Sequence, residues 1–379
     1  MNTRYDLAVV GAGIVGLAHA WAAARLGKKV VVIERDARAV GASIRNFGFV
    51  TVTGQQRGAM WRRALTSSRR WRQVAGEAGI ALLHDGLLMC ARRPEALDVL
   101  EAFRATEMGE DCRLLSPAAV HADHPHITGV AAGALWSPHE TRVESRDAIR
   151  RLAAWLEERW GVRFLWSMAV LAADPPAIRT ARGTVHAEAA ILCPGDDHVS
   201  LHPERLSGLR RTRLQMLRLA DPGFRLSCGV MSDLGLARYA GYAALPEAAA
   251  LRARLAAEQP RHLAHGVHLI AVQSEDGSLV VGDSHHDAET PLPFASSAVD
   301  VLILDEYAQV LSAPPPVVER WTGTYSVSVS GAPVLVERIS DAVRLVVVTT
   351  GAGASTAFAL AEAVVGDLYG HADWKETIP

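Results

Sequence analysis

The N-terminal part of the chain alternates short apolar runs with one alanine-rich stretch. Residues 5–10 (YDLAVV) are typical of a buried strand, and residues 14–27 (IVGLAHAWAAARLG) predict a helix that Gly27 ends. The apolar run that follows, KKVVVIER at 28–35, predicts a second buried strand. This order predicts a βαβ unit at the start of the chain.

The pattern of apolar and polar positions defines the elements less clearly in the middle of the chain. Residues 57–80 predict a polar helix and residues 81–91 a strand. Residues 145–161 predict an amphipathic helix that stops at a glycine, and residues 185–197 predict a buried strand ending in Pro-Gly.

A change of pattern follows at about residue 207. Residues 207–318 predict arginine-rich strands with alternating apolar and polar positions, and Asp276-Gly277 is a hairpin signal. The APPP run at 313–316 marks a boundary. Residues 343–370 then return to a strand, a glycine turn and a helix.

Charge and composition narrow the functional classes. The 379 residues include 39 basic and 41 acidic side chains, which gives no electrostatic reason to expect a nucleic-acid partner. No apolar run is long enough to span a bilayer, and the start of the chain lacks a secretory signal. We therefore expect a cytoplasmic protein of more than one domain, with a small-molecule ligand and no membrane partner.

The positions of the cysteines and lysines argue against a disulfide framework, a zinc site and a Schiff-base lysine. The cysteines are Cys90, Cys112, Cys193 and Cys228. They form no C-x-x-C pair, so neither a disulfide framework nor a zinc site is expected. The lysines are Lys28, Lys29 and Lys375. Because these open a strand or lie in the C-terminal tail, a Schiff-base lysine is not expected.

A glycine motif lies at the turn of the predicted βαβ unit. Gly11, Gly13 and Gly16 have the Gly-x-Gly-x-x-Gly spacing, and Glu34 ends the second strand. Such glycines let the turn tighten, let the backbone approach a pyrophosphate and let helix and strand pack closely. An acid at the strand end binds ribose hydroxyls, so the motif predicts a dinucleotide site.

The C-terminal stretch decides between NAD(P) and FAD. A buried strand runs into Gly351 and Gly353, and a helix begins at about Ser355. A second helix N-terminus can stabilise the negative charge that a flavin acquires when it accepts a hydride. An ordinary βα turn would have the same pattern, but the two features together favour FAD.

The chain resembles a known family over nearly its whole length. The segments that carry the resemblance are GAGIVG (11–16), Glu34, GASIRNFG (41–48), ILCPG (191–195), RWTG (320–323) and TTGAGAST (349–356). They are similar to the FAD-dependent D-amino acid oxidase, glycine oxidase and sarcosine oxidase group. The resemblance implies a mixed fold, α/β with α+β: a Rossmann-like FAD-binding domain with an inserted antiparallel-sheet substrate domain.

The same resemblance implies domain boundaries and cofactor contacts. The FAD-binding domain would comprise 1–80, 145–205 and 320–379, and the substrate domain 81–144 and 206–319. The residues facing FAD would be Gly11, Gly13, Ile14, Val15, Gly16, Glu34, Arg35, Ser43, Arg45, Asn46, Val170, Gly195, Gly351, Gly353, Ala354, Ser355 and Thr356.

The resemblance also bears on how FAD is held. Relatives that attach it covalently use a cysteine shortly before the C-terminal glycine loop or a histidine soon after the GAS segment. Here the last cysteine is Cys228, and residues 42–83 contain no histidine. We therefore expect non-covalent FAD.

Four shorter stretches resemble one branch of the family, associated with phosphonate breakdown. They are residues 135–149, 214–218, 281–287 and 350–360. The branch implies oxidation of N-methyl-2-aminoethylphosphonate to phosphonoacetaldehyde and methylamine. A glycine, sarcosine or D-amino acid oxidase is the alternative, and a flavoprotein of tRNA modification or assembly is a third reading.

An anionic amine would need arginine or histidine partners, because no lysine lies between residues 30 and 374. The candidates for substrate binding are Arg238, Tyr239, Tyr242, His285 and His286. Arg45 is expected closer to FAD, and Arg45 and His286 are the candidate catalytic residues.

Two further expectations concern a metal and the electron acceptor. Asp283 and Asp287 flank the two histidines, but this spacing lies at a strand end and not on a helix face, so no metal is expected. Oxygen or another compound would accept the electrons. Sarcosine oxidases place a lysine in the strand that corresponds to 279–284, and its absence here predicts slow reaction with oxygen.

Overall fold

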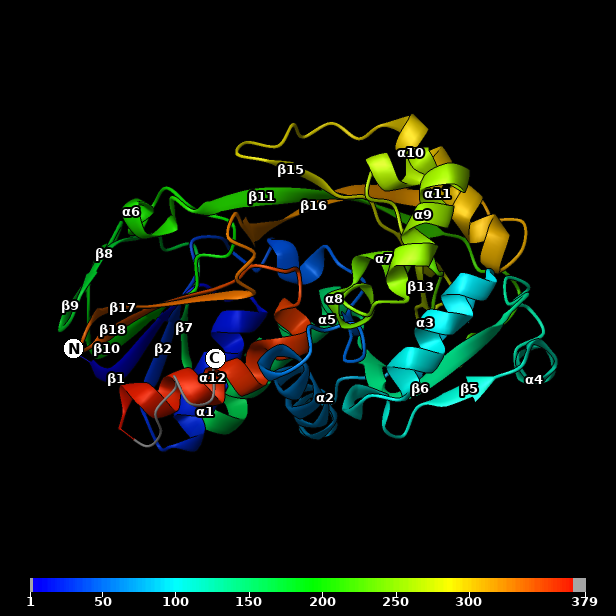
Figure 1. Cartoon of the computed structure of the whole chain (residues 1–379). Coiled ribbons are helices and arrows are strands. Elements are labelled where there is room, and N and C mark those ends of the chain that lie inside the picture. Colours follow the sequence, from blue (N-terminus) through cyan, green and yellow to red (C-terminus); the bar gives the residue numbers. More distant parts are fainter. Residues whose placement is uncertain (1–2, 371–379) are drawn as a thin grey trace.

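The computed structural model describes residues 3–370 and contains two large β-sheets (Figure 1). The first has the strand order β17-β18-β10-β1-β2-β7, with the β8–β9 hairpin paired to β10. Its strands are β1 (Arg4–Val10), β2 (Val30–Ile33), β7 (Arg163–Leu165), β8 (Val170–Asp174), β9 (Ala177–Thr180), β10 (Gly183–Leu192), β17 (Val334–Ser340) and β18 (Val343–Val348). The neighbours β18, β10, β1, β2 and β7 are parallel, as in the predicted βαβ architecture.

The second sheet is mainly antiparallel and has the order β15-β11-β14-β13-β12-β4-β6-β3, with β16 paired to β11 and β5 to β6. Its strands are β3 (Phe49–Val50), β4 (His84–Ala91), β5 (Arg113–Leu115), β6 (Gly133–Arg142), β11 (Leu209–Leu219), β12 (Gly229–Met231), β13 (Ile270–Gln273), β14 (Leu279–Gly282), β15 (His286–Ala288) and β16 (Val317–Ser328). In Figure 1 the long β11–β16 ladder extends over the top of the molecule from one sheet toward the other.

Helices cover both sheets. They are α1 (Ile14–Arg25), α2 (Ala59–Ala78), α3 (Pro94–Arg104), α4 (Pro117–Asp123), α5 (Ser145–Trp160), α6 (Pro203–Leu206), α7 (Leu234–Arg238), α8 (Ala240–Ala243), α9 (Ala248–Glu258), α10 (Pro260–Ala264), α11 (Ser297–Val310) and α12 (Gly353–Leu368), with short 3-10 turns at Ala42–Ile44 and Glu107–Gly109. The apolar faces of α1, α2, α5 and α12 pack with the first sheet in one core cluster. The described helices include none long and apolar enough to cross a membrane.

The prediction of strands throughout 207–318 is wrong in part. Five helices, α7 to α11, lie within this range. Residues 248–258, AAALRARLAAE, form α9 because alanine, leucine and arginine are strong helix formers. The Asp276-Gly277 hairpin is present between β13 and β14, with antiparallel pairing.

The predicted domain boundaries differ from the sheets at two strands. Residue 320 falls inside β16, yet the whole of this strand pairs with β11 in the second sheet. The short strand β3 belongs to that sheet as well, although residues 1–80 were expected in the first domain. Because β16 pairs with β11 from Val317 to Ser328, a boundary at residue 320 divides one continuous ladder.

Arg142 links three segments of the second sheet. Its side chain is fully buried and donates hydrogen bonds to the Phe47 carbonyl at 3.1 Å and the Gln273 carbonyl at 3.0 Å. It also pairs with Glu144 at 2.9 Å and with the Ser274 hydroxyl at 3.2 Å. Burial lowers the pKa of Arg142, and the Glu144 carboxylate acts against that change. One guanidinium thus joins β6, β13 and the loop before β3.

We expect Arg142→Met to lower the free energy of unfolding by about 3–5 kcal/mol, because the substitution removes the donor of two buried carbonyls, Phe47 and Gln273, and one cationic partner of the partly buried Glu144. The matched control is Arg150→Ala, whose exposed side chain pairs with Asp147 on the surface of α5. That change should cost about 1 kcal/mol or less. Chemical denaturation measures both, and equal losses would contradict this role for Arg142.

Candidate functional site

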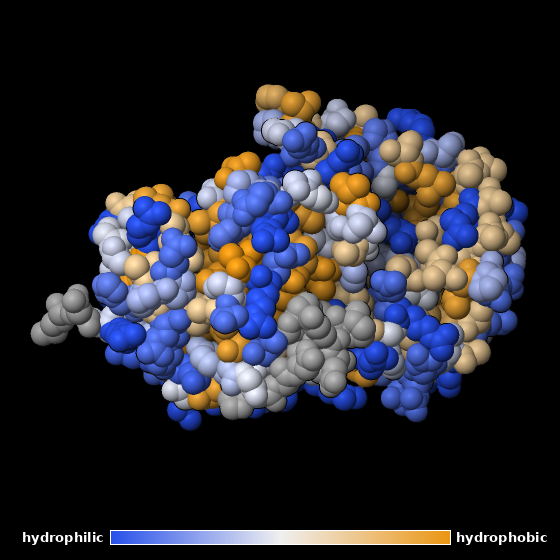
Figure 2. Space-filling model, turned by 60° about the vertical axis from the view of Figure 1, so that its left-hand side comes forward, coloured by the Kyte–Doolittle hydropathy of each residue, from blue (hydrophilic) through white to orange (hydrophobic). Residues whose placement is uncertain are grey.

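A cavity of about 770 Å³ runs between the two sheets. Its wall includes the turn after β1, the start of α12 and residues of β16. The space-filling view in Figure 2 shows apolar residues gathered at the middle of this face of the molecule, among hydrophilic ones. The volume lies within the range of about 300–1,000 Å³ that small-molecule and cofactor sites have.

The turn after β1 requires its glycines. A Cβ on Gly16 would lie 1.9 Å from the Gly11 carbonyl oxygen, and one on Gly11 would lie 2.5 Å from the Cys193 carbonyl oxygen. Gly11 also has a φ of +102°. The helix N-terminus of α1 can therefore come close to both β1 and the cavity, as an anion site at a helix N-terminus requires.

Polar side chains hold this turn in place. The Glu34 carboxylate accepts a hydrogen bond from the Ala12 amide at 2.8 Å, and the Ser43 hydroxyl accepts one from the Ile14 amide at 2.9 Å. The Asn46 amide group donates to the Ala42 carbonyl at 2.8 Å. These contacts order the loop that closes over the start of α1.

The N-terminus of α12 opens on the same cavity. Gly353 begins the helix, and a Cβ there would meet no atom closer than 3.7 Å. The Trp71 indole donates to the Ala354 carbonyl at 2.8 Å, and the Ser355 hydroxyl accepts from the Thr51 amide at 2.9 Å. Two helix N-termini on one cavity fit a dinucleotide whose pyrophosphate and electron-accepting ring both favour positive potential.

Most residues expected to face FAD line this cavity. They are Gly11, Gly13, Ile14, Val15, Gly16, Glu34, Arg35, Ser43, Arg45, Asn46, Val170, Gly195, Gly351, Gly353, Ala354 and Ser355. Thr356 does not: its side chain is fully buried, and its hydroxyl donates to the Ala352 carbonyl at 2.8 Å. One residue further along a helix points about 100° away, which turns Thr356 into the core.

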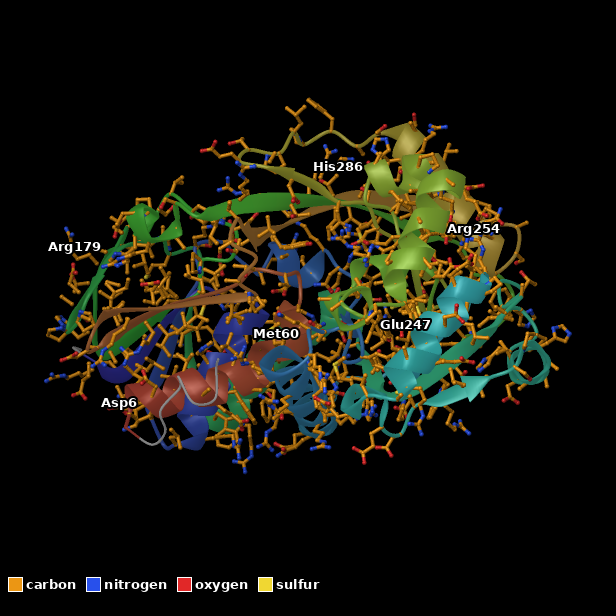
Figure 3. All side chains as sticks on the ribbon, in the orientation of Figure 1. Asp6, Met60, Arg179, Glu247, Arg254 and His286 are labelled. Carbon is orange, nitrogen blue, oxygen red and sulfur yellow. The ribbon has the colours of Figure 1, made fainter. Side chains whose placement is uncertain are left out.

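Some of the expected substrate residues line the cavity and others do not. Arg238, Tyr239 and His285 line the cavity, whereas Tyr242 and His286 are not part of its wall. Tyr242 is fully buried and donates to the Thr53 hydroxyl at 2.6 Å. His286, which is labelled in Figure 3, begins β15, and its ring contacts His265 at 3.0 Å. Adjacent residues of extended chain point to opposite sides, so His285 and His286 cannot both face the cavity.

Two residues of the cavity wall, Asp283 and Tyr325, and their neighbour His268 are not among the predicted substrate residues. The sequence pattern offers Asp283 only as a possible metal ligand and does not single out His268 or Tyr325. The hairpin signal could have found His268, because the antiparallel pairing of Ile270 with Gly282 brings it beside the residues that follow β14. The His268 amide indeed donates to the Asp283 carbonyl at 3.3 Å.

The Asp283 cluster consists of Asp283, His268 and His285. The Nε2 atom of His268 lies 3.4 Å from Oδ1 of Asp283, and the Nε2 atom of His285 lies 3.6 Å from Oδ2. The Tyr239 hydroxyl contacts the Nε2 atom of His268 at 3.0 Å. The two imidazoles stack with centroids 5.2 Å apart, and the Tyr325 ring meets His285 edge-on at 6.3 Å.

Burial dominates the electrostatics of this cluster. It raises the pKa of Asp283 to about 7, and the nearby Arg238 charge acts against part of that rise. Burial and Arg238 together lower the pKa of His268 to about 3. The same two causes lower the pKa of His285 well below its ordinary value. Both imidazoles are therefore neutral near pH 7, while the carboxyl group titrates there.

The surroundings of the Asp283 cluster disfavour a bound metal ion. One ligand-type atom from each of its three side chains lies within 4.8 Å of the others. However, the Arg238 guanidinium is near enough to act on the pKa of all three groups. A fixed positive charge at that distance disfavours a divalent cation.

We expect Gly16→Ala to abolish retention of the dinucleotide, because the added methyl group would push α1 away from the Gly11 carbonyl. The matched control is Gly76→Ala on the exposed side of α2, where a Cβ meets nothing within 4 Å. The measurement is the flavin absorbance per protein after desalting. A Gly16→Ala protein as yellow as the control would contradict the close approach.

Comparison with known proteins agrees with this geometry. The family model for FAD dependent oxidoreductases (DAO) matches residues 6–366. A glycine oxidase from Bacillus cereus superposes with a TM-score of 0.79 at 15% identity, covering 99% of this chain and 97% of that one. The L-proline dehydrogenase from P. horikoshii gives 0.77 at 15% identity, with 99% and 96% covered.

A glycine oxidase from Geobacillus kaustophilus gives a TM-score of 0.76 at 17% identity, with 97% and 95% covered. Identities this low show the shared fold alone, which is the predicted mixed fold of a Rossmann-like domain and a second, antiparallel sheet. The family match is independent of them and extends over nearly the whole chain. The chain belongs to the DAO family of FAD-dependent oxidoreductases, and FAD is its cofactor, as the sequence predicts.

Proposed function

We propose that the protein oxidises a small amine that carries an anionic group, and that this amine is N-methyl-2-aminoethylphosphonate. The carbon beside nitrogen would lose a hydride, and water would hydrolyse the resulting imine to phosphonoacetaldehyde and methylamine. Bound FAD supplies the hydride acceptor. The proteins with a similar fold include oxidases and a dehydrogenase named for amino acids, which supports an amine substrate.

The observation that carries this proposal is the state of Arg238. Among residues 3–370 its guanidinium has neither an ion pair nor a hydrogen bond, and it lines the cavity. The other arginines of the second sheet that could take this role are engaged. Arg211 donates to the Asp196 carbonyl at 2.7 Å, and Arg320 pairs with Asp300 at 2.7 Å.

An anion inside the cavity would need such a cation, because a buried phosphonate or carboxylate is costly without charged hydrogen-bond donors. Three arginines line the cavity. Arg35 pairs with Asp197 at 2.6 Å, at the end of the cavity near Glu34. Arg45 lies beside Gly323, where a Cβ would approach its side chain to 3.2 Å. The Arg45 guanidinium likewise has no ion pair or hydrogen bond among residues 3–370. We assign the substrate anion to Arg238 because Arg238 adjoins the Asp283 cluster, whereas Arg45 is expected nearer FAD.

The side chains then have separate tasks. Arg238 binds the anionic group with a planar fork that matches two oxygens. Tyr239, next to it in the chain, keeps its hydroxyl on His268 and so forms a fixed wall. Arg45 and the N-terminus of α12 direct positive potential toward the cofactor. Positioning of the carbon beside nitrogen is the main contribution expected of the protein.

A panel of amines tests the proposed function. Under anaerobic conditions, N-methyl-2-aminoethylphosphonate should bleach the flavin absorbance at lower concentration than glycine, sarcosine or D-amino acids. A protein that prefers one of those amino acids supports the alternative oxidase activity. A protein that no amine reduces would contradict both and would leave the tRNA-modification or assembly reading.

We expect Arg238→Ala to raise KM by about one to two orders of magnitude, the loss of one charged hydrogen-bond partner, with FAD still bound. The matched control is Arg225→Ala, which removes an exposed arginine that pairs with Asp221 outside the cavity wall. Steady-state kinetics with the preferred amine measures both. If Arg238→Ala keeps the wild-type kcat/KM, the anion contact must be sought at Arg45, Arg211, Arg213 or Arg320.

We also expect FAD to be released by acid. Cys193 and His285 are the cysteine and histidine of the cavity wall. Burial raises the pKa of Cys193, which disfavours the thiolate needed for attachment, and the Nδ1 atom of His285 is bonded to the Gly266 carbonyl at 3.1 Å. After acid precipitation the yellow colour should be in the supernatant. Colour that stays in the protein pellet would show a covalent bond.

A further inference from the structure

We propose that Asp283 accepts the proton of the substrate ammonium group, so that the amine is neutral when its hydride leaves. The Nε2 atoms of His268 and His285 lie 3.4 Å and 3.6 Å from the two oxygens of this carboxyl group. The proposal rests on the proposed oxidation of an amine and adds a proton acceptor to a site otherwise described by positioning alone.

The placement of Asp283 is the first argument. Its side chain is almost completely buried, yet the residue lines the same cavity as Arg238. The Oδ1 atom has no hydrogen-bond donor among the described residues. A buried carboxylate oxygen without a donor is costly, so it is expected to be met by a ligand or to carry a proton.

The protonation of His285 is the second argument. Its Nδ1 atom contacts the Gly266 carbonyl at 3.1 Å, and a carbonyl can only accept, so Nδ1 carries the hydrogen. The neutral ring then turns a bare Nε2 toward Asp283. Two acceptors face each other there unless a proton lies between them. Because the pKa of His285 is far below ordinary values and that of Asp283 is about 7, the proton belongs to Asp283.

The chemistry of the substrate requires such an acceptor. An alkylammonium group with a pKa near that of lysine, about 10.4, is about 99.9% protonated at pH 7. Its nitrogen has no free electron pair to form the carbon–nitrogen double bond as hydride leaves. Transfer of the proton to Asp283 breaks the N–H bond and leaves its electron pair on nitrogen. The hydride then leaves carbon with the C–H electron pair for FAD, the oxidant, and Asp283 later returns the proton to solvent.

Charge complementarity supports the same arrangement. Arg238 offers a cation and Asp283 a carboxylate in one part of the cavity, which matches an amine with an anionic group. The titratable groups that act on Asp283 or adjoin it are Arg238, Tyr239, His268, His285 and Tyr325. Near pH 7 both tyrosines and both histidines are neutral. Among these groups Arg238 therefore supplies the positive charge, and Asp283 is the group whose charge changes there.

The pH dependence has a definite sign. Because the pKa of Asp283 is raised to about 7, the carboxylate that can accept a proton forms as pH rises through 7. The value of kcat/KM for the preferred amine should therefore rise with pH along a limb with an apparent pKa near 7. The holoenzyme should show this limb in steady-state kinetics and in anaerobic flavin reduction.

The test compares Asp283→Asn with Asp287→Asn. Asp287 follows four residues later, is exposed, and accepts a hydrogen bond from Thr212 at 2.5 Å. Asp283→Asn should lose the limb near pH 7, lower kcat/KM at pH 7 by about 10²–10³-fold, and recover toward the wild-type value near pH 10, where the amine loses its proton unaided. Asp287→Asn should keep the wild-type profile. A limb near pH 7 that persists in Asp283→Asn would overturn the proposal.

Infrared difference spectroscopy between pH 6 and pH 8 gives a readout other than activity. The stretch of a protonated carboxyl group should disappear over this range in the wild-type protein and be absent in Asp283→Asn. If Asp283→Asn does not fold, Asp283→Glu replaces it and should keep the limb at a shifted pKa. Absence of the band in the wild type, or a limb that chelator treatment removes, would overturn the proposal in favour of an ionised aspartate or a metal.

The outcomes separate this inference from the proposed function. If an amine reduces the flavin equally well in the wild type and in Asp283→Asn at pH 7, the oxidase function stands and the inference fails. If no amine reduces the flavin of the wild type, both fail.

Discussion

The packing of α12 against α1 and α2 is the interaction on which the rest of the site depends. The Phe358 ring lies edge-on between Trp21 of α1 and Trp71 of α2, with centroids 5.2 Å away in both cases. Trp71 also donates its indole hydrogen bond to the Ala354 carbonyl in the first turn of α12. These contacts fix the start of α12 beside the start of α1. Without them, two segments more than 300 residues apart in the sequence could not present their N-termini to one cavity.

The second sheet and its connecting segments supply the rest of the cavity wall. Strand β16 brings Tyr325, the β13–β14 hairpin brings Asp283, and the C-terminus of α7 brings Arg238 to the cavity wall. Arg142 ties the loop before β3 to β13, so the hairpin that carries Asp283 is held against the segment that carries Arg45. The cavity therefore has a nucleotide end built on backbone glycines and a substrate end built on charged side chains.

Most residues that the sequence predicts for the nucleotide end line the cavity, because the signals that identify them are local. Glycines at a turn, an acid at a strand end and a glycine loop before a helix identify their own surroundings, and only Thr356 among the expected cofactor residues lies off the cavity wall. The fold followed from the family resemblance, whereas the helices within 234–310 were missed. In α9, for example, the run LRARL at 251–255 places leucine and arginine at spacings that fit either a strand or a helix, and packing decides between them.

The substrate end was harder to predict because it depends on which way a side chain points. His286 was chosen together with His285, although neighbouring residues of a strand face opposite sides. Tyr242 lies one helical turn beyond Tyr239 but enters the core against Phe103, with ring centroids 4.6 Å apart. Asp283 and His268 come together only through the hairpin register, and their burial, which sets their protonation, is a property of the folded chain.

The most direct test of this account is a crystal structure of the FAD-bound protein with an unreactive analogue of 2-aminoethylphosphonate, in which two methyl groups replace the hydrogens on the carbon beside nitrogen. We predict the phosphonate oxygens on the Arg238 guanidinium and the nitrogen within hydrogen-bond distance of the Asp283 carboxyl group. A phosphonate bound at Arg45 or outside the cavity, with the nitrogen away from Asp283, would contradict the account.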